Sequence, residues 1–129
     1  MSSKKVIVVS EKAPKAIGPY SVAVKAGKLL FTAGQMGLDP ESGEFVPGGI
    51  EAETRQALKN IETILQAAGS SLKSVVKTTV FLRDINDFGV MNVIYGEFFS
   101  EKFPARSAVQ AAKLPKDGAI EIEAIAMLE

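Results

Sequence analysis

The 129-residue sequence contains neither cysteine nor histidine. The lack of cysteine excludes disulfides, thiolate nucleophiles, zinc–thiolate sites and iron–sulfur clusters. The lack of histidine excludes serine–histidine nucleophile pairs, imidazole acid–base catalysis and most transition-metal sites. Any chemistry must therefore use arginine, lysine, carboxylate, hydroxyl or backbone groups, and we expect neither a bound metal nor a cofactor.

An excess of charge of one sign is also missing, because fifteen basic side chains balance fifteen acidic ones. Proteins that bind nucleic acid or anionic membranes usually carry a basic excess, so neither is expected as a partner. The balance also leaves little repulsion to oppose self-association. The apolar stretch Val6 to Val9 is too short for a signal-peptide core or a membrane span, which predicts a cytoplasmic protein.

The sequence predicts a single domain over residues 1–129, because its composition is even and no repeat or linker interrupts it. Turn-forming residues gather in LDPESGEFVPGG (38–49), which we expect to be the longest loop. Alternating and β-branched segments predict strands at 5–9, 21–26, 29–34, 74–82, 105–111 and 119–128. Apolar residues at three- and four-residue steps predict helices at 50–68 and from Asp84 or Asn86 to about 103.

Each predicted helix has a single apolar stripe. In the first helix the stripe consists of Ile50, Ala57, Leu58, Ile61, Ile64, Leu65 and Ala68, and in the second of Phe88, Met91, Tyr95, Phe98 and Phe99. Two such helices can cover the same face of one mixed sheet. The predicted fold class is therefore α/β, a two-layer sandwich with both helices on one face.

The predicted terminal strand is apolar on both faces. The side chains that should meet the helices are Ile120, Ile122, Ala124, Ala126 and Leu128, because they alternate along the strand. Ile125 and Met127 point the other way, on the face that two helices leave uncovered. Such a face needs protein cover, and another copy of the chain is the simplest one.

Two polar residues stand in apolar or uncharged surroundings. Arg106 lies in the strand segment FPARSAVQAA, where an isolated guanidinium needs a partner, and its planar fork fits a carboxylate. That carboxylate belongs either to a substrate or to a glutamate of the protein. Asn92 borders the apolar stripe of the second helix, so its amide must hydrogen-bond either a backbone group or a ligand.

Three further residues have both a functional and a structural interpretation. Glu121 and Glu123 share a strand face with Ile125 and Met127. One of them is either a general acid–base carboxylate tuned by partial burial or simply part of a solvated edge. Tyr20 follows the Gly18-Pro19 turn and either lines a pocket or packs on the rim of the core.

Four segments together resemble the reactive-intermediate deaminase (Rid) family. They are IGPYSVA (17–23), FTAGQMG (31–37), VVKTTVFLRDINDF (75–88) and FPARSAV…LPKDGAIEIEAIA (103–126), in the family's order and spacing. The resemblance implies a chorismate-mutase-like fold that assembles as a homotrimer with clefts between subunits. It also implies hydrolysis of 2-iminobutanoate and 2-iminopropanoate, which pyridoxal-phosphate-dependent dehydratases release, to 2-oxo acids and ammonia.

The resemblance also implies roles for individual residues. Arg106 is similar to the arginine that grips the substrate carboxylate, and Glu121 to the glutamate that orients the attacking water. Tyr20 corresponds to a tyrosine that lines the cleft, and Asn92 to a pocket asparagine. The backbone carbonyl of Ala108 corresponds to one that contacts the substrate nitrogen.

Three positions depart from the common family pattern. Ala33 replaces a frequent serine, Ala108 a frequent cysteine and Val22 a frequent glutamine. Because the carbonyl of Ala108 is the implied contact, we expect catalysis to survive the loss of the thiol. The substrate range is what these replacements put in question.

The implied reaction needs little chemical machinery, because the imine carbon is already electrophilic. Positioning by Arg106 and acid–base work by Glu121 would suffice without a metal or a covalent nucleophile. The alternative is a non-catalytic trimer that binds a small carboxylate or regulates a partner. Ribonuclease activity, attributed to some family members, is disfavoured because histidine and a basic surface are lacking.

Overall fold

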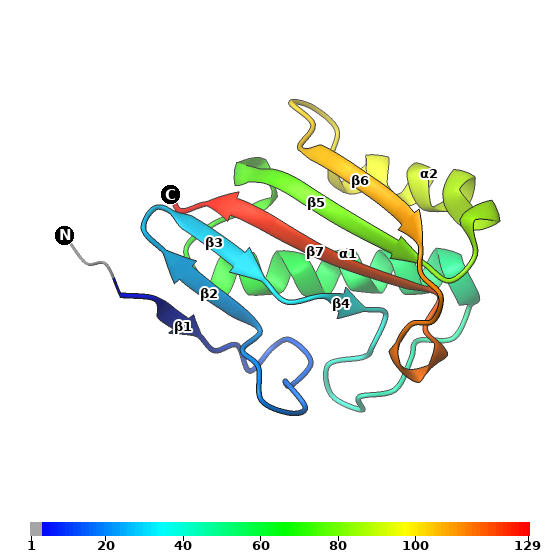
Figure 1. The fold of residues 1–129 in the computed structure, drawn as a ribbon, viewed down its shortest axis with the longest axis horizontal. Coiled ribbons are helices and arrows are strands. Elements are labelled where there is room, and N and C mark those ends of the chain that lie inside the picture. Colours follow the sequence, from blue (N-terminus) through cyan, green and yellow to red (C-terminus); the bar gives the residue numbers. More distant parts are fainter. Residues whose placement is uncertain (1–3) are drawn as a thin grey trace.

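Strand β7 runs through the middle of the sheet in the computed structural model, which describes residues 4–129 (Figure 1). The strands are β1 (Val6–Val8), β2 (Ala23–Ala26), β3 (Leu29–Thr32), β4 (Gln35–Met36), β5 (Val75–Leu82), β6 (Ala105–Gln110) and β7 (Ile120–Met127). The helices are α1 (Gly49–Ala67) and α2 (Phe88–Phe98). The sheet has the order β1-β2-β3-β7-β5-β6, with β4 paired to β7. The β5–β6 pair is parallel and the other described pairs are antiparallel, which makes the sheet mixed.

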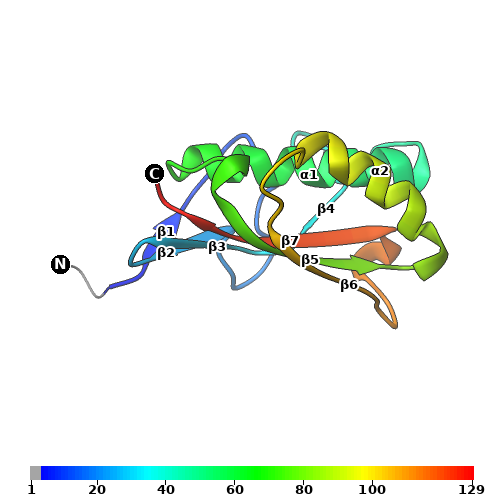
Figure 2. The same ribbon diagram turned by 90° about the horizontal axis from the view of Figure 1, so that it is seen from above.

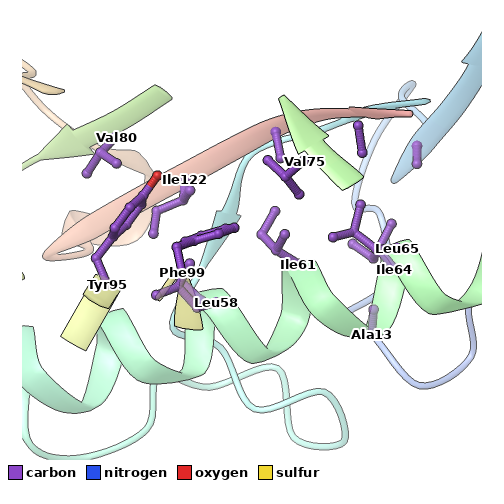
Figure 3. Close-up of a cluster of buried hydrophobic side chains, with 14 of the residues drawn as sticks. Ala13, Leu58, Ile61, Ile64, Leu65, Val75, Val80, Tyr95, Phe99 and Ile122 are labelled. Carbon is purple, nitrogen blue, oxygen red and sulfur yellow. The ribbon is translucent and has the colours of Figure 1, made fainter. Parts of the chain in front are cut away.

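Both helices lie on one face of this sheet (Figure 2), which confirms the predicted two-layer arrangement. The stripe on α1 is buried as its spacing predicts, with Leu58, Ile61 and Leu65 completely inaccessible to solvent. These side chains pack with Tyr95 and Phe99 against the sheet (Figure 3). Burying a side chain of this size contributes about 1.5–3 kcal/mol. No helix in the described part of the chain is long and apolar enough to cross a membrane.

The two faces of β7 have opposite characters, as the alternation predicts. Ile120, Ile122, Ala124 and Ala126 are buried beneath the helices. The residues between them point to the other face, which we call the open face of the sheet. Leu128 lies just beyond the end of β7 and is half-buried.

The open face carries apolar side chains that the chain leaves accessible. The register pairs Leu29 with Met127 and Phe31 with Ile125, which places these four residues side by side. Leu29, Phe31 and Met127 are between 37% and 49% exposed. Accessible apolar patches of this kind are typical of surfaces that bind protein, membrane or ligand.

The second helix is shorter than its periodicity predicts. It begins at Phe88, after a 3-10 turn over Ile85–Asp87 that Asp84 caps by accepting a hydrogen bond from the backbone N–H of Asn86. It ends at Phe98, because Phe99 has extended backbone angles. The predicted end near residue 103 is therefore wrong, although Phe99 remains in the core.

Strand β4 was not predicted, and the predicted strand 29–34 ends at Thr32. Buried Asn60 on α1 holds the segment around β4 in place. Its side-chain amide donates to the carbonyls of Met36, at 3.2 Å, and Leu38, at 3.0 Å. Polar groups on the inner face of α1 thereby fix the chain that leads from the sheet into the long loop.

Replacing Asn60 by alanine should lower the free energy of unfolding by about 2–3 kcal/mol, because two backbone carbonyls of the β4 segment lose their donor. Chemical denaturation measures this loss. Gln56→Ala is the matched control, since it removes only the bond from Gln56 to Asn60 and should cost about 1 kcal/mol. Equal losses in the two variants would contradict this interpretation.

Candidate functional site

Arg106 on β6 is held by one face of α2. Its Nη1 donates to Oδ1 of Asn92 at 2.8 Å. Its guanidinium carbon lies 4.7 Å from the ring centroid of Tyr95 and 5.3 Å from that of Phe88. Contacts of this length are cation–π interactions, which also restrict how the guanidinium plane can turn. We call these four residues the arginine cradle.

The spacing of the cradle explains how the sequence builds it. Phe88, Asn92 and Tyr95 are four and three residues apart on α2, so they lie above one another on one helix face. Thr78 on β5 is the register partner of Arg106 and therefore points to the same side of the sheet. The hydroxyls of Thr78 and Tyr95 are 2.7 Å apart, which ties the sheet to the helix beneath the arginine.

The structural interpretation of Arg106, a salt bridge to a glutamate, is wrong within the single chain. Arg55 pairs with Glu97 and Arg83 with Asp117, whereas no carboxylate of the described residues lies within ion-pairing distance of Arg106. Because Asn92 accepts a hydrogen bond only from Nη1, the other N–H groups of the guanidinium are available to bind the carboxylate of a ligand. Asn92 meets this side chain rather than a backbone group.

A cavity of about 480 Å³ with largely apolar walls lies beside Arg106. Its lining residues are Asn92, Tyr95, Gly96, Phe99, Phe103, Pro104 and Arg106. An arginine without an internal acid at the edge of an apolar hollow is suited to bind a small carboxylate that carries a short apolar chain.

Glu121 lies in a second cavity of about 480 Å³, on the open face. This cavity is lined by Pro14, Lys15, Ile17, Tyr20, Ala33, Gly34, Gln35, Met36, Leu38, Pro115, Lys116 and Glu121. Burial raises the pKa of the Glu121 carboxyl above its ordinary value, and the neighbouring charge of Glu123 raises it further. A carboxyl whose pKa is raised is better matched to proton transfer near neutral pH than an exposed one.

The backbone of the β3–β4 connection brings this carboxyl into place. A methyl group on Gly34 would lie 2.7 Å from the carboxyl carbon of Glu121, so a side chain at this position would displace the carboxyl. Ala33 precedes it and lines the same cavity. The hydroxyl of Tyr20, at the cavity wall, accepts a hydrogen bond from the backbone N–H of Ile17 at 3.4 Å, and the ring is 51% exposed, so it does not pack into the core.

Ala108 lies on β6, the edge strand of the sheet. The N–H of Ala111 bonds the carbonyl of Leu82 on β5, so alternate residues of this strand point their backbone groups toward β5. By the same alternation the carbonyls of Arg106 and Ala108 point away from β5, toward the open edge. A carbonyl in that direction is available to a ligand or a second chain.

A single chain does not bring the two predicted catalytic residues together. Arg106 lies on the helix side of the sheet, level with Thr78, whereas Glu121 alternates with buried Ile120 and Ile122 and lies on the open face. The arginine cradle groups Arg106 with Asn92, and the second cavity groups Glu121 with Tyr20 and Ala33. The predicted site residues therefore form two half-sites.

Sequence reasoning gave no site role to Tyr95, Phe88, Thr78 or Gly34. The aromatic residues were assigned to the apolar stripe of the second helix alone. The signal that was available is the spacing of Phe88, Asn92 and Tyr95, which puts an amide and two rings on one helix face. Nothing in the sequence shows that an edge-strand arginine reaches that face.

The fold is that of a small α/β protein. One half-site presents an arginine suited to a small carboxylate, and the other presents a carboxyl with a raised pKa. The family described as endoribonuclease L-PSP matches residues 10–128 of the chain. The chain is 54% identical over 121 residues to 2-iminobutanoate/2-iminopropanoate deaminase from Bos taurus. The matched region covers 94% of this chain and 88% of the relative. Its structure is similar to that of RidA from the Antarctic bacterium Psychrobacter sp., with a TM-score of 0.92, 46% identity and coverage of 95% and 99% of the two chains.

A further similar structure is that of TdcF from E. coli with bound serine, with a TM-score of 0.91, 43% identity and coverage of 96% of this chain and 99% of the other. The chain therefore belongs to the Rid family, which the endoribonuclease L-PSP description covers. This confirms the resemblance that the sequence motifs indicate.

Removing the charge of Glu123 should lower the pKa of Glu121 toward its ordinary value while leaving it raised, because burial is the larger cause and remains. The measurement is a pH titration of the Glu123→Gln variant in which the chemical shift of the Glu121 carboxyl carbon is monitored by NMR. Glu62→Gln, on α1, is the control that should leave the Glu121 midpoint unchanged. An unchanged midpoint in Glu123→Gln would mean that the two carboxylates do not interact.

Proposed function

We propose that this protein hydrolyses small 2-imino acids, such as 2-iminobutanoate and 2-iminopropanoate, to 2-oxo acids and ammonia. The observation that carries the proposal is the arginine cradle, which holds Arg106 ready for a carboxylate that the chain itself does not provide. The likeness to a 2-iminobutanoate/2-iminopropanoate deaminase from Bos taurus supports the same substrate class.

The complete site forms between subunits of a homotrimer with a chorismate-mutase-like arrangement. Two observations support this assembly. The two half-sites lie on opposite sides of the sheet, so one chain cannot apply Arg106 and Glu121 to one small substrate. The apolar open face, which adjoins the Glu121 cavity through β7, supplies a surface for the neighbouring copy.

The substrate binds with its carboxylate on the guanidinium of Arg106. Asn92 and Tyr20 line the cleft, and the Ala108 carbonyl accepts a hydrogen bond from the substrate nitrogen. Ala33 lines the Glu121 cavity with a methyl group where a serine would place a more polar hydroxyl. The cleft thereby favours substrates with apolar side chains.

Hydrolysis begins when water attacks the imine carbon. Glu121 accepts a proton from this water as the new C–O bond forms and passes it to the nitrogen as the C=N π bond opens. In the resulting carbinolamine the carboxylate takes the hydroxyl proton as the C=O bond forms and delivers it to the nitrogen, so that ammonia leaves as the C–N bond breaks. Acid–base work of this kind contributes roughly 10²–10⁴-fold, and positioning by Arg106 adds several kcal/mol. No cofactor or metal takes part in these steps.

A non-catalytic trimer that binds a small carboxylate is the second candidate, because Arg106 serves binding and turnover equally. The serine in the structure of TdcF from E. coli is a small molecule that carries a carboxylate. Turnover separates the two candidates. A cytoplasmic location, without nucleic-acid or membrane partners, completes the proposal.

A coupled assay tests the proposed reaction. Threonine dehydratase supplies 2-iminobutanoate, semicarbazide traps it, and the protein should suppress semicarbazone formation. Arg106→Ala should lower kcat/KM by about 100-fold, because a charge-assisted, two-bond contact is lost.

Arg55→Ala is the matched control, because this arginine pairs with Glu97 on the outer surface of the helices. It should leave the rate within about twofold of wild type. If the folded, trimeric wild type suppresses no more semicarbazone than buffer, the deaminase proposal fails and the binding protein takes its place.

A further inference from the structure

We infer that Tyr95, fixed by Thr78, is a positioning residue that sets the plane of the Arg106 guanidinium for a two-bond contact with the substrate carboxylate. The inference rests on the proposed function and deepens it. It starts from the observation that Tyr95 contacts Arg106 through its ring and Thr78 through its hydroxyl.

The ring of Tyr95 controls one rotational freedom that Asn92 leaves open. A single hydrogen bond from Nη1 to Asn92 fixes one corner of the guanidinium but allows it to pivot about that bond. The Tyr95 ring, with its centroid 4.7 Å from the guanidinium carbon, lies against the planar group and opposes this pivot. A carboxylate that binds two nitrogens of the fork requires the plane to be held.

The ring is itself held from two sides. Its hydroxyl points toward the sheet (Figure 3) and lies 2.7 Å from the hydroxyl of Thr78. The Phe99 ring packs on it, with 4.7 Å between centroids. Tyr95 is 6% exposed and Thr78 is 1% exposed, so neither side chain has room to change rotamer.

The phenol remains a neutral hydroxyl at physiological pH. Burial raises its pKa above the ordinary value, although the Thr78 bond and the charge of Arg106 oppose that shift. Because Thr78 adjoins Arg106 across the β5–β6 register, the same pair of strands carries the arginine and the anchor of its ring. The distance between them is therefore set by the strand pairing.

The test separates positioning from a general loss of stability. Tyr95→Leu keeps an apolar side chain but removes the ring, and it should raise KM for 2-iminobutanoate about tenfold while kcat changes less than about twofold. Tyr95→Phe retains the ring and loses only the Thr78 bond, so it should restore KM to within about threefold of wild type. Phe98→Leu is the matched control, since it removes a ring of α2 that packs against the core but belongs neither to the cradle nor to the lining of its cavity.

Two further measurements keep this test independent of the proposed reaction. Affinity for the product 2-oxobutanoate, measured by calorimetry, should fall with Tyr95→Leu in parallel with the rise in KM. In an Arg106→Lys background, where no planar fork exists, Tyr95→Leu should change that affinity by less than about twofold.

The inference is overturned if Phe98→Leu raises KM as much as Tyr95→Leu, or if the Tyr95 effect persists undiminished with Lys at position 106. A wild type that binds 2-oxobutanoate with the expected Tyr95 dependence but turns over no imine would retain the inference and reject the proposed function. If the wild type hydrolyses the imine and Tyr95→Leu leaves KM unchanged, the proposed function is retained and the inference about Tyr95 is rejected.

Discussion

The alternation of side chains along β7 governs both the core and the site. Its inward residues, Ile120 and Ile122 among them, are completely buried beneath α1 and α2, so the strand cannot slip by one residue without exposing the core. The same register turns Glu121 to the open face, where Gly34 leaves room for its carboxyl. The strand thus fixes the position of the Glu121 carboxyl, which we propose transfers the proton, through the packing of its opposite face.

The edge strand β6 makes the complementary contribution. It carries Arg106 on the helix side, where the guanidinium donates a hydrogen bond to Asn92 and lies over the Tyr95 ring. Two half-sites on opposite sides of one sheet explain why the open face stays apolar and accessible in the single chain. We propose that assembly covers this face and joins the half-sites in the same step, so that folding of the subunit prepares catalysis and association completes it.

The sequence predicted those features that periodicity encodes. The stripe on α1, the two faces of β7 and the uncovered open face all follow from spacings of two or three to four residues. Strand β4 was missed because two residues carry no period, and its anchor, Asn60, bonds backbone carbonyls more than twenty positions earlier in the chain. The arginine cradle was missed because an aromatic residue on the inner face of the helix is expected whether it packs in the core or contacts Arg106. The sequence pattern of Tyr95 therefore does not distinguish the two roles. The roles of Arg106, Glu121, Tyr20, Asn92, Ala33 and Ala108 stay predictions that the two half-sites make specific.

Subunit complementation tests most directly whether each active site is shared between two chains. Arg106→Ala and Glu121→Gln, each inactive alone, are unfolded together, refolded as mixed trimers and assayed for 2-iminobutanoate hydrolysis. Random mixing should restore roughly a quarter of wild-type activity, because each cleft then has one chance in four of receiving both intact residues from different chains. A mixture of Arg106→Ala with the double variant Arg106→Ala/Glu121→Gln is the control and should stay inactive. If native mass spectrometry shows mixed trimers and the complementing pair is no more active than its parents, the shared site is contradicted.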